Sequence, residues 1–265
     1  MAGGIAGKIM RGVSLAAESP RLISDAMRMN RVRKKNLPLS LKIKPLLAFA
    51  KLGIPPEAKV VFDVGANAGQ FALLADKYFY SADIYSFEPV ASTFSQLENS
   101  VAGKQNIKPY RLGLFSRNGH AEINVTSYSP ANSMLNVHPD YDKAYGNVVQ
   151  ETGKKETIEI RTIDSFVEEN KIGKIDLLKI DVEGVEADVL LGAKQTLKER
   201  VDRVYIEISF VRRGRKENAF LEIYSMLDGL DFALCTISGA EYSSDGNARL
   251  LSQFDALFVK KSLLQ

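Results

Sequence analysis

The sequence has few of the cysteine and histidine residues that form disulfide bonds and metal sites. Its 265 residues include one cysteine, Cys235, and two histidines, His120 and His138. A single cysteine excludes an intrachain disulfide framework. Cys235 stands in an apolar strand, so we expect it in the core, and neither histidine stands in a metal or triad motif, so we expect both at the surface. The fold must therefore depend on an apolar core, which this length can supply.

Long apolar runs are also missing. No stretch reaches the roughly 18 apolar residues that a membrane span requires. Lys8 and Arg11 interrupt the apolar residues at the N-terminus, where a signal peptide would need a continuous run. We therefore expect a cytoplasmic location.

Charge is distributed unevenly. Residues 1–51 carry eleven Lys or Arg and two acids, a net charge of +9 that leaves −6 for the remainder of a chain whose total is +3. The acidic remainder argues against a nucleic-acid groove, which needs clustered cations. The basic arm is either a solvated helical face packed on the core or a contact with acidic lipid or an anionic substrate. We divide the chain into a basic helical extension, residues 1–55, and a main domain, residues 56–265.

Strand and helix patterns alternate from Lys59 onward. Continuous apolar runs at 60–64, 84–87 and 175–180 predict parallel strands that helices cover on both faces. The last two strand patterns, 232–237 and 256–259, are joined by a polar loop and predict an antiparallel pair at one edge. The expected fold class is α/β, with a Rossmann-like, mostly parallel sheet, an antiparallel C-terminal edge and an N-terminal helical extension.

A glycine turn follows the first of these strands. Asp63, Gly65, Asn67 and Gly69 lie where strand passes into helix, at the edge of the sheet where ligands bind. Gly65 can adopt a positive φ and Gly69 allows close packing of the helix. Asn67 replaces a glycine of the dinucleotide fingerprint, which favours a ligand without a diphosphate. Asp63 either binds a cationic amine, directly or through water, or braces the amides of the turn.

Acidic residues end three further strands. Glu88 follows Gly65 by 23 residues, the spacing at which an acid binds a ribose diol, although it could equally be an exposed strand end. Asp181 and Glu183 crowd into the same edge as candidate site residues. Glu186 can be explained by the start of a helix, which prefers anions. Glu207 interrupts a buried strand and needs a partner, either structural or in an active site.

Four segments together resemble the FkbM-type methyltransferases: 63–71, 87–89, 161–166 and 177–186. The similarity extends over roughly residues 60–235, and the element KIDVEGVE within the last segment is quite specific to that family. The resemblance implies a class I methyltransferase fold, S-adenosylmethionine as donor, and O-methylation of sugars, glycoconjugates or secondary metabolites. It also implies a donor site that includes Asp63, Gly65, Asn67 and Glu88, to which we add Gly69 from the same turn.

The resemblance places Asp181 beside the reacting centre. We expect Asp181 to orient or deprotonate a hydroxyl, with Glu183 assisting. Alternatively, Asp181 and Glu207 hold a divalent cation that acidifies the hydroxyl. Three other functions stay open: an N-methyltransferase, a nicotinamide-dependent oxidoreductase, which Asn67 disfavours, and a non-catalytic module that docks through residues 1–50. The expected partner is a small-molecule or glycan acceptor.

Overall fold

The computed structural model describes residues 53–79, 81–126, 132–135, 151–210, 219–245 and 248–264. The predicted N-terminal extension and His138 lie almost wholly outside this part, so the domain division and the membrane contact stay predictions. At the start of the described chain, Ile54 is buried and its carbonyl accepts a hydrogen bond from Tyr78 Oη at 2.6 Å. None of the helices described here is both long and apolar enough to cross a membrane.

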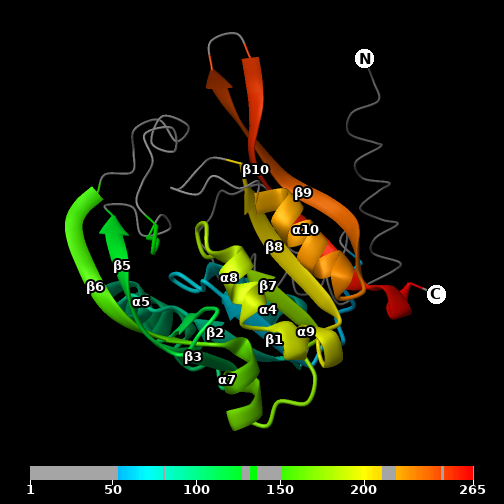
Figure 1. Cartoon of the computed structure of the whole chain (residues 1–265). Coiled ribbons are helices and arrows are strands. Elements are labelled where there is room, and N and C mark those ends of the chain that lie inside the picture. The colour runs from blue at the N-terminus through cyan, green and yellow to red at the C-terminus, as the bar shows by residue number, and fades with distance from the viewer. Residues whose placement is uncertain are drawn as a thin grey trace, which may run out of the picture.

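A seven-stranded sheet forms the centre of the molecule, in the order β3-β2-β1-β7-β8-β10-β9 (Figure 1). In that order the strands are β3 Ile107–Tyr110, β2 Asp83–Phe87, β1 Val60–Val64, β7 Leu177–Ile180, β8 Arg203–Ser209, β10 Ala248–Lys260 and β9 Phe232–Asp245. The first five are parallel, and β10 runs antiparallel to β8 and β9. This confirms the predicted Rossmann-like sheet with its antiparallel C-terminal edge. Strand order reverses between β1 and β7, which is where such sheets bind ligands.

Helices cover both faces of this sheet, which explains its uninterrupted apolar strands. They are α4 Gln70–Tyr78, α5 Ala91–Val101, α7 Ile163–Glu169, α8 Glu186–Leu191, α9 Lys194–Glu199 and α10 Ala219–Gly229. Val61 packs with side chains of α4 and α5, whereas its neighbour Phe62 packs with those of α7 to α10. Successive side chains of β1 therefore belong to two separate hydrophobic cores, one on each face of the sheet.

One predicted helix is in fact two. The sequence pattern predicts a single amphipathic helix over 185–200, but the chain bends between α8 and α9. At Gly192 a Cβ would lie 2.0 Å from the carbonyl oxygen of Phe115, so only glycine allows this approach. The Gly192 carbonyl accepts a hydrogen bond from the Asp164 amide at 3.0 Å. A tertiary contact therefore overrides the helical periodicity.

A second sheet lies beside the first and was not predicted. Its strands are β4 Gly113–Leu114, β6 Glu151–Arg161 and β5 Gly119–Thr126, in the order β4-β6-β5. The sequence indicates two alternating strands here, but it ends the second at Ile163, which instead begins α7. Ile123, Ile158 and Ile160 pack with Val90 in a small core of their own.

The C-terminal edge differs from expectation in two ways. The predicted polar loop over 238–249 is mostly strand, because β9 and β10 stay paired from Phe232↔Lys260 to Asp245↔Ala248. The two strands run on together beyond the rest of the sheet (Figure 1). Cys235 is exposed, so its predicted place in the core is wrong. It lies on the edge strand β9, where a side chain has a neighbouring strand on one side only.

Candidate active site

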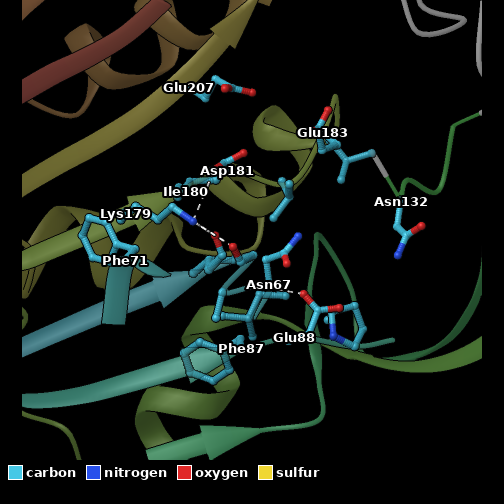
Figure 2. A pocket seen from close by; sticks show the side chains of 18 of the residues that line it. Asn67, Phe71, Phe87, Glu88, Asn132, Lys179, Ile180, Asp181, Glu183 and Glu207 are labelled. Carbon is cyan, nitrogen blue, oxygen red and sulfur yellow. Dashed lines mark hydrogen bonds and ion pairs between the residues drawn. The ribbon is translucent and has the colours of Figure 1, made fainter. Parts of the chain in front are cut away.

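The register of the sheet brings the predicted acids together. Val64 pairs with Phe87 and with Ile180, and Ile180 pairs in turn with Ile206. The residues that follow this row are Gly65, Glu88, Asp181 and Glu207. All four line one cavity of about 380 Å³ at the carboxyl ends of the parallel strands. In Figure 2, Glu88 and Glu207 lie at opposite ends of the view with Asp181 between them.

The glycine turn after β1 is in close contact with the end of β7. Gly65 has φ +77°, and a Cβ there would lie 1.8 Å from the carbonyl oxygen of Asp181. The amides of Gly65 and Ala66 donate to the Phe87 carbonyl at 3.1 and 2.9 Å. Asn67, also with positive φ, lines the cavity together with Gly65. Gly65 is thus required by space as well as by backbone angle.

Gly69 has a different role within the same turn. It caps α4 with φ +91°, and a Cβ there would lie 3.0 Å from Leu97 Cδ1 and 3.4 Å from Val101 Cγ1. Both neighbours belong to α5. Gly69 therefore allows α4 to approach α5, and it does not line the cavity.

Glu88 is buried and holds the turn in place. Its two carboxylate oxygens accept hydrogen bonds from the amides of Asn67 and Val90, at 3.1 and 3.0 Å. Only 7% of the residue is exposed, so the alternative of an exposed strand end is wrong. Burial raises the pKa of Glu88 to about 7, although the two amides and Lys179 oppose the shift.

Lys179 is the residue that sequence reasoning missed. Its Nζ lies 3.1 Å from Asp63 Oδ1 and 3.4 Å from Asp181 Oδ2, and it donates to the Gly65 carbonyl at 2.8 Å. Burial acts to lower the pKa of Lys179, but the two carboxylates outweigh it and raise that pKa. The signal was present in the sequence, since a lysine inside the apolar run of β7 must be paired, as was argued for Glu207.

Asp63 stands behind this lysine. Its side chain is fully buried and is not part of the cavity lining. Burial raises the pKa of Asp63, while the charge of Lys179 lowers it. Any effect of Asp63 on a bound ligand therefore passes through Lys179, and the predicted direct contact with an amine is not available in this arrangement.

The turn between β7 and α8 is fixed from two sides. Glu186 Oε1 accepts hydrogen bonds from the amides of Gly184 and Val182, at 2.9 and 3.3 Å. Ser133, which is buried, donates from Oγ to the Glu183 carbonyl at 2.7 Å. Glu183 itself has φ +60°. Glu186 therefore has a structural role in this turn, and it is not one of the three carboxylates that could hold a cation.

Three carboxylates face one another across the cavity. Oxygen atoms of Asp181, Glu183 and Glu207 lie within 4.8 Å of one another, and they could together hold a hard divalent cation. Burial, followed by repulsion from Asp181 and Glu183, raises the pKa of Glu207 to about 10. Glu207 Oε1 accepts a hydrogen bond from Gln253 Nε2 at 3.2 Å, so this carboxyl group pairs with a side-chain amide on β10.

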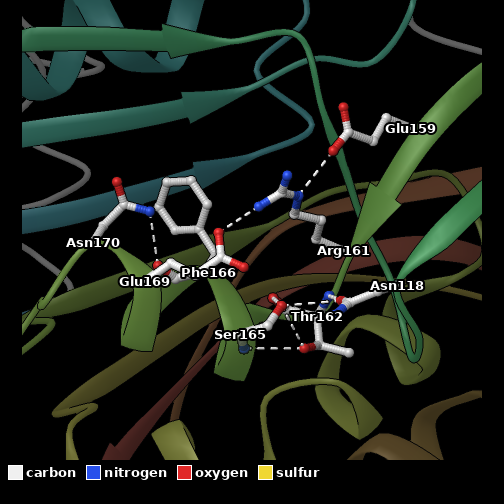
Figure 3. A network of polar contacts seen from close by, with 8 residues as sticks. All are labelled: Asn118, Glu159, Arg161, Thr162, Ser165, Phe166, Glu169 and Asn170. Atoms are coloured by element: carbon white, nitrogen blue, oxygen red, sulfur yellow. Dashed lines mark hydrogen bonds and ion pairs between the residues drawn. The ribbon is translucent and has the colours of Figure 1, made fainter.

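The segment 161–166 supports the site without lining it (Figure 3). Thr162 Oγ1 accepts from the Ser165 amide at 3.0 Å and caps α7. Asn118 Oδ1 accepts from the Thr162 amide and the Ser165 hydroxyl, at 2.8 and 3.0 Å. Phe166 packs against Phe87 with ring centroids 4.9 Å apart. These contacts fix α7 beneath the strand that carries Glu88.

A family model and several curated relatives match this chain. The model of the methyltransferase FkbM domain matches residues 63–234. Methyltransferase 1 of Beauveria bassiana is 26% identical over 58% of this chain and 66% of its own length. Hexuronic acid methyltransferase AglP of Haloferax volcanii is 31% identical over 57% of this chain and 56% of its own. 31-O-demethyl-FK506 methyltransferase FkbM of Streptomyces tacrolimicus is 27% identical over 66% of this chain and 73% of its own length.

Among solved structures, a putative RNA methyltransferase from Pyrococcus horikoshii has a TM-score of 0.44 at 14% identity, over 91% of this chain and 98% of that one. The chain thus spans two thirds or less of the Beauveria and Haloferax proteins. The family match, by contrast, covers more than half of this chain and includes both turns of the cavity. The chain therefore belongs to the FkbM methyltransferase domain family.

Proposed function

We propose that the chain transfers the methyl group of S-adenosylmethionine to a hydroxyl oxygen of a sugar, glycoconjugate or secondary metabolite. Its membership of a methyltransferase family supports the transfer of a methyl group. Two relatives carry names that refer to a hexuronic acid and to the 31-O position of FK506, which favours oxygen acceptors.

The observation that carries the proposal is the cavity at the switch point, with Glu88 toward one end, Glu207 toward the other and Asp181 between them (Figure 2). Gly65 allows the turn after β1 to meet the end of β7 at the cavity, and Glu88 offers carboxylate oxygens to a ribose diol. Asn67 stands where a diphosphate would need glycine. These residues suit an adenosyl nucleoside without a diphosphate. When bound, S-adenosylmethionine supplies a methyl group that its sulfonium charge has already activated.

The protein's contribution is then to align the acceptor and manage its proton. Holding two reactants in line can contribute about 7–11 kcal/mol to the lowering of the barrier. In our proposal Asp181, whose side chain is 40% exposed, orients the acceptor hydroxyl and takes its proton. A positioned base of this kind accelerates reactions by roughly 10²–10⁴-fold. Glu183 assists from the same turn, and Glu207, protonated at neutral pH, can donate a hydrogen bond.

A divalent cation could also promote loss of the acceptor hydroxyl proton. Bound between Asp181, Glu183 and Glu207, it would acidify the acceptor hydroxyl. Transfer that is equally fast with excess chelator and with added Mg²⁺ would rule this route out and leave Asp181 as the base.

The proposal is tested first by binding and then by turnover. Calorimetry should show binding of S-adenosylmethionine and none of NAD⁺. Mass spectrometry of reactions with a panel of sugars and hydroxylated secondary metabolites should find a gain of one methyl group. Asp181→Asn should abolish transfer while the variant still binds S-adenosylhomocysteine, which shows that the fold is intact. Binding of NAD⁺ in preference, or transfer at a normal rate by Asp181→Asn, would contradict the proposal.

A further inference from the structure

A short segment beside the cavity ties the second sheet to the turn after β7. Residues 132–135 run along β5, where Ser133 and Asn124 pair through backbone hydrogen bonds of 2.9 and 3.3 Å. On its other side, Ser133 Oγ donates to the Glu183 carbonyl at 2.7 Å. The neighbouring residue Asn132 therefore lies close to this turn, and its side chain lines the cavity.

Hydrogen bonds determine which end of the Asn132 amide faces a ligand. Asn132 Oδ1 accepts from the backbone amide of Thr126 at 2.8 Å and from its hydroxyl at 3.3 Å. A backbone N–H always donates, so the oxygen must be the end that meets Thr126. Within the described residues these are the hydrogen bonds of this side chain, and neither involves Nδ2. Nδ2 therefore offers its N–H donors to the cavity.

Asn132 lies on the side of the cavity that we assign to the acceptor. In Figure 2 it lies with Glu183 on one side of Asp181, whereas Lys179 lies on the other. In the proposed function Asp181 and Glu183 bind the acceptor hydroxyl, and Glu88 binds the ribose of the donor. An amide donor beside the first two acids therefore faces the acceptor.

The amide and the carboxylate select different groups of an acceptor. Ionised Asp181 binds a group that donates, namely the hydroxyl that becomes methylated, whereas Asn132 Nδ2 binds only a group that accepts. Together they fit an acceptor that carries a second oxygen close to the reacting hydroxyl. Vicinal diols of sugar rings and hydroxy acids have this arrangement, and an isolated alcohol does not.

We infer that Asn132 is a specificity-determining residue for the acceptor, and that its Nδ2 donates a hydrogen bond to an oxygen near the hydroxyl that is methylated. The inference rests on the proposed function and narrows it to acceptors with two neighbouring oxygens. The second contact orients the acceptor as well as binding it. A site built to hydrogen-bond a substrate group discriminates strongly against an analogue that lacks the group, because the protein's donor is then left unpaired.

The test begins with the member of the acceptor panel that the full-length chain methylates fastest. It compares this acceptor with analogues from which one oxygen near the methylated position has been removed. We expect kcat/KM to fall at least about tenfold for one of these analogues. Asn132→Ala and Asn132→Asp should each reduce this ratio several-fold. Asn132→Asp is the closer match, because its carboxylate still accepts from Thr126 and only the donor is lost.

Calorimetry with S-adenosylhomocysteine separates this role from a contact with the donor. Both variants should bind this nucleoside within about twofold of the wild type, because Gly65 and Glu88 are unchanged. Asn99→Ala, on the exposed face of α5 and outside the lining, should match the wild type in both measurements.

The outcomes separate the inference from the proposed function. A ratio that neither variant changes would overturn the inference while the proposed function stands. So would a loss of nucleoside affinity of about tenfold or more in Asn132→Asp, since Asn132 would then contact the donor. Failure of the wild type to bind the nucleoside or to methylate any panel member would remove both. Should Asn132→Ala fail to fold, Asn132→Asp decides, because it keeps the contact with Thr126.

Discussion

At the scale of single residues, Lys179 connects the acid buried behind the cavity with an acid that lines it. It is the cation beside the fully buried Asp63, and it also neutralises part of Asp181. The sequence shows the residue but not its buried partner Asp63, which lies on β1, more than a hundred positions earlier in the chain. Pairing across β1 and β7 is what creates the cluster.

Lys179→Met should destabilise the fold by about 3–5 kcal/mol, because it leaves Asp63 buried without its cation. The loss should be smaller at low pH, where protonation of Asp63 removes the charge. Urea unfolding at pH 5 and pH 8 measures both effects. Lys155→Met, which breaks the exposed Lys155–Glu122 pair, should cost no more than about 1 kcal/mol. Equal losses in the two variants would refute the argument.

Glu88 should make donor binding depend on pH. Its pKa of about 7 means that about half of the protein carries a protonated Glu88 at neutral pH. A ribose diol donates best to the ionised form, so affinity for S-adenosylmethionine should rise as the pH increases from 6 to 8. Calorimetry at these values measures the slope. Glu88→Gln should bind more weakly and lose the slope; a pH-independent wild-type affinity would show that Glu88 does not contact the donor as proposed.

The raised pKa of Glu88 also makes the stability of the folded state depend on pH. Burial places the pKa of Glu88 above its ordinary value of 4.5. The unfolded chain therefore releases this proton at lower pH than the folded one. Between about pH 4.5 and pH 7, Glu88 favours the folded state less as the pH rises.

At the scale of elements, the contact between the two turns is the feature that most constrains the sequence. Gly65→Ala places a Cβ 1.8 Å from the Asp181 carbonyl oxygen and also strains φ. Gly103→Ala strains φ in the same way, at +81°, but meets nothing within 4 Å. Because both variants strain φ, the difference between their stabilities measures the effect of the contact between position 65 and the Asp181 carbonyl.

We expect Gly103→Ala to lower stability by about 1 kcal/mol and to bind S-adenosylmethionine normally. Gly65→Ala should lose at least about 2 kcal/mol more and most of its donor affinity, because β1 and β7 must separate. Thermal unfolding and calorimetry measure the two quantities. Similar behaviour of both variants would mean that the backbone at position 65 can move away at little cost.

The elements also show how far the sequence could predict the structure. The apolar runs of β1, β2 and β7 correctly place three strands, and their ends give Glu88 and Asp181. The break at Gly192 and the exposure of Cys235 could not be read from local patterns. Both depend on neighbours from distant parts of the chain, namely Phe115 and the sheet edge.

At the scale of the whole molecule, the strand order determines which acids meet. Because the order reverses between β1 and β7, the ends of β2, β1, β7 and β8 form one continuous row. The sequence predicts that Glu88, Asp181 and Glu207 end strands, yet only the register places them around a single cavity. The second sheet could not be predicted, because no local sequence pattern indicates which strands pair. In this sheet β6 pairs with both β4 and β5.

The separate small core of the second sheet has an evolutionary consequence. Ile123 and Ile158 reach the cavity, yet they pack with Val90 and Ile160 in a cluster apart from the two large cores. Mutations there can reshape one wall while the peptide contact between Gly65 and Asp181 stays intact. Lineages of this family that acquire new acceptors should therefore diverge fastest along β5 and β6, and should retain the joint between the two turns.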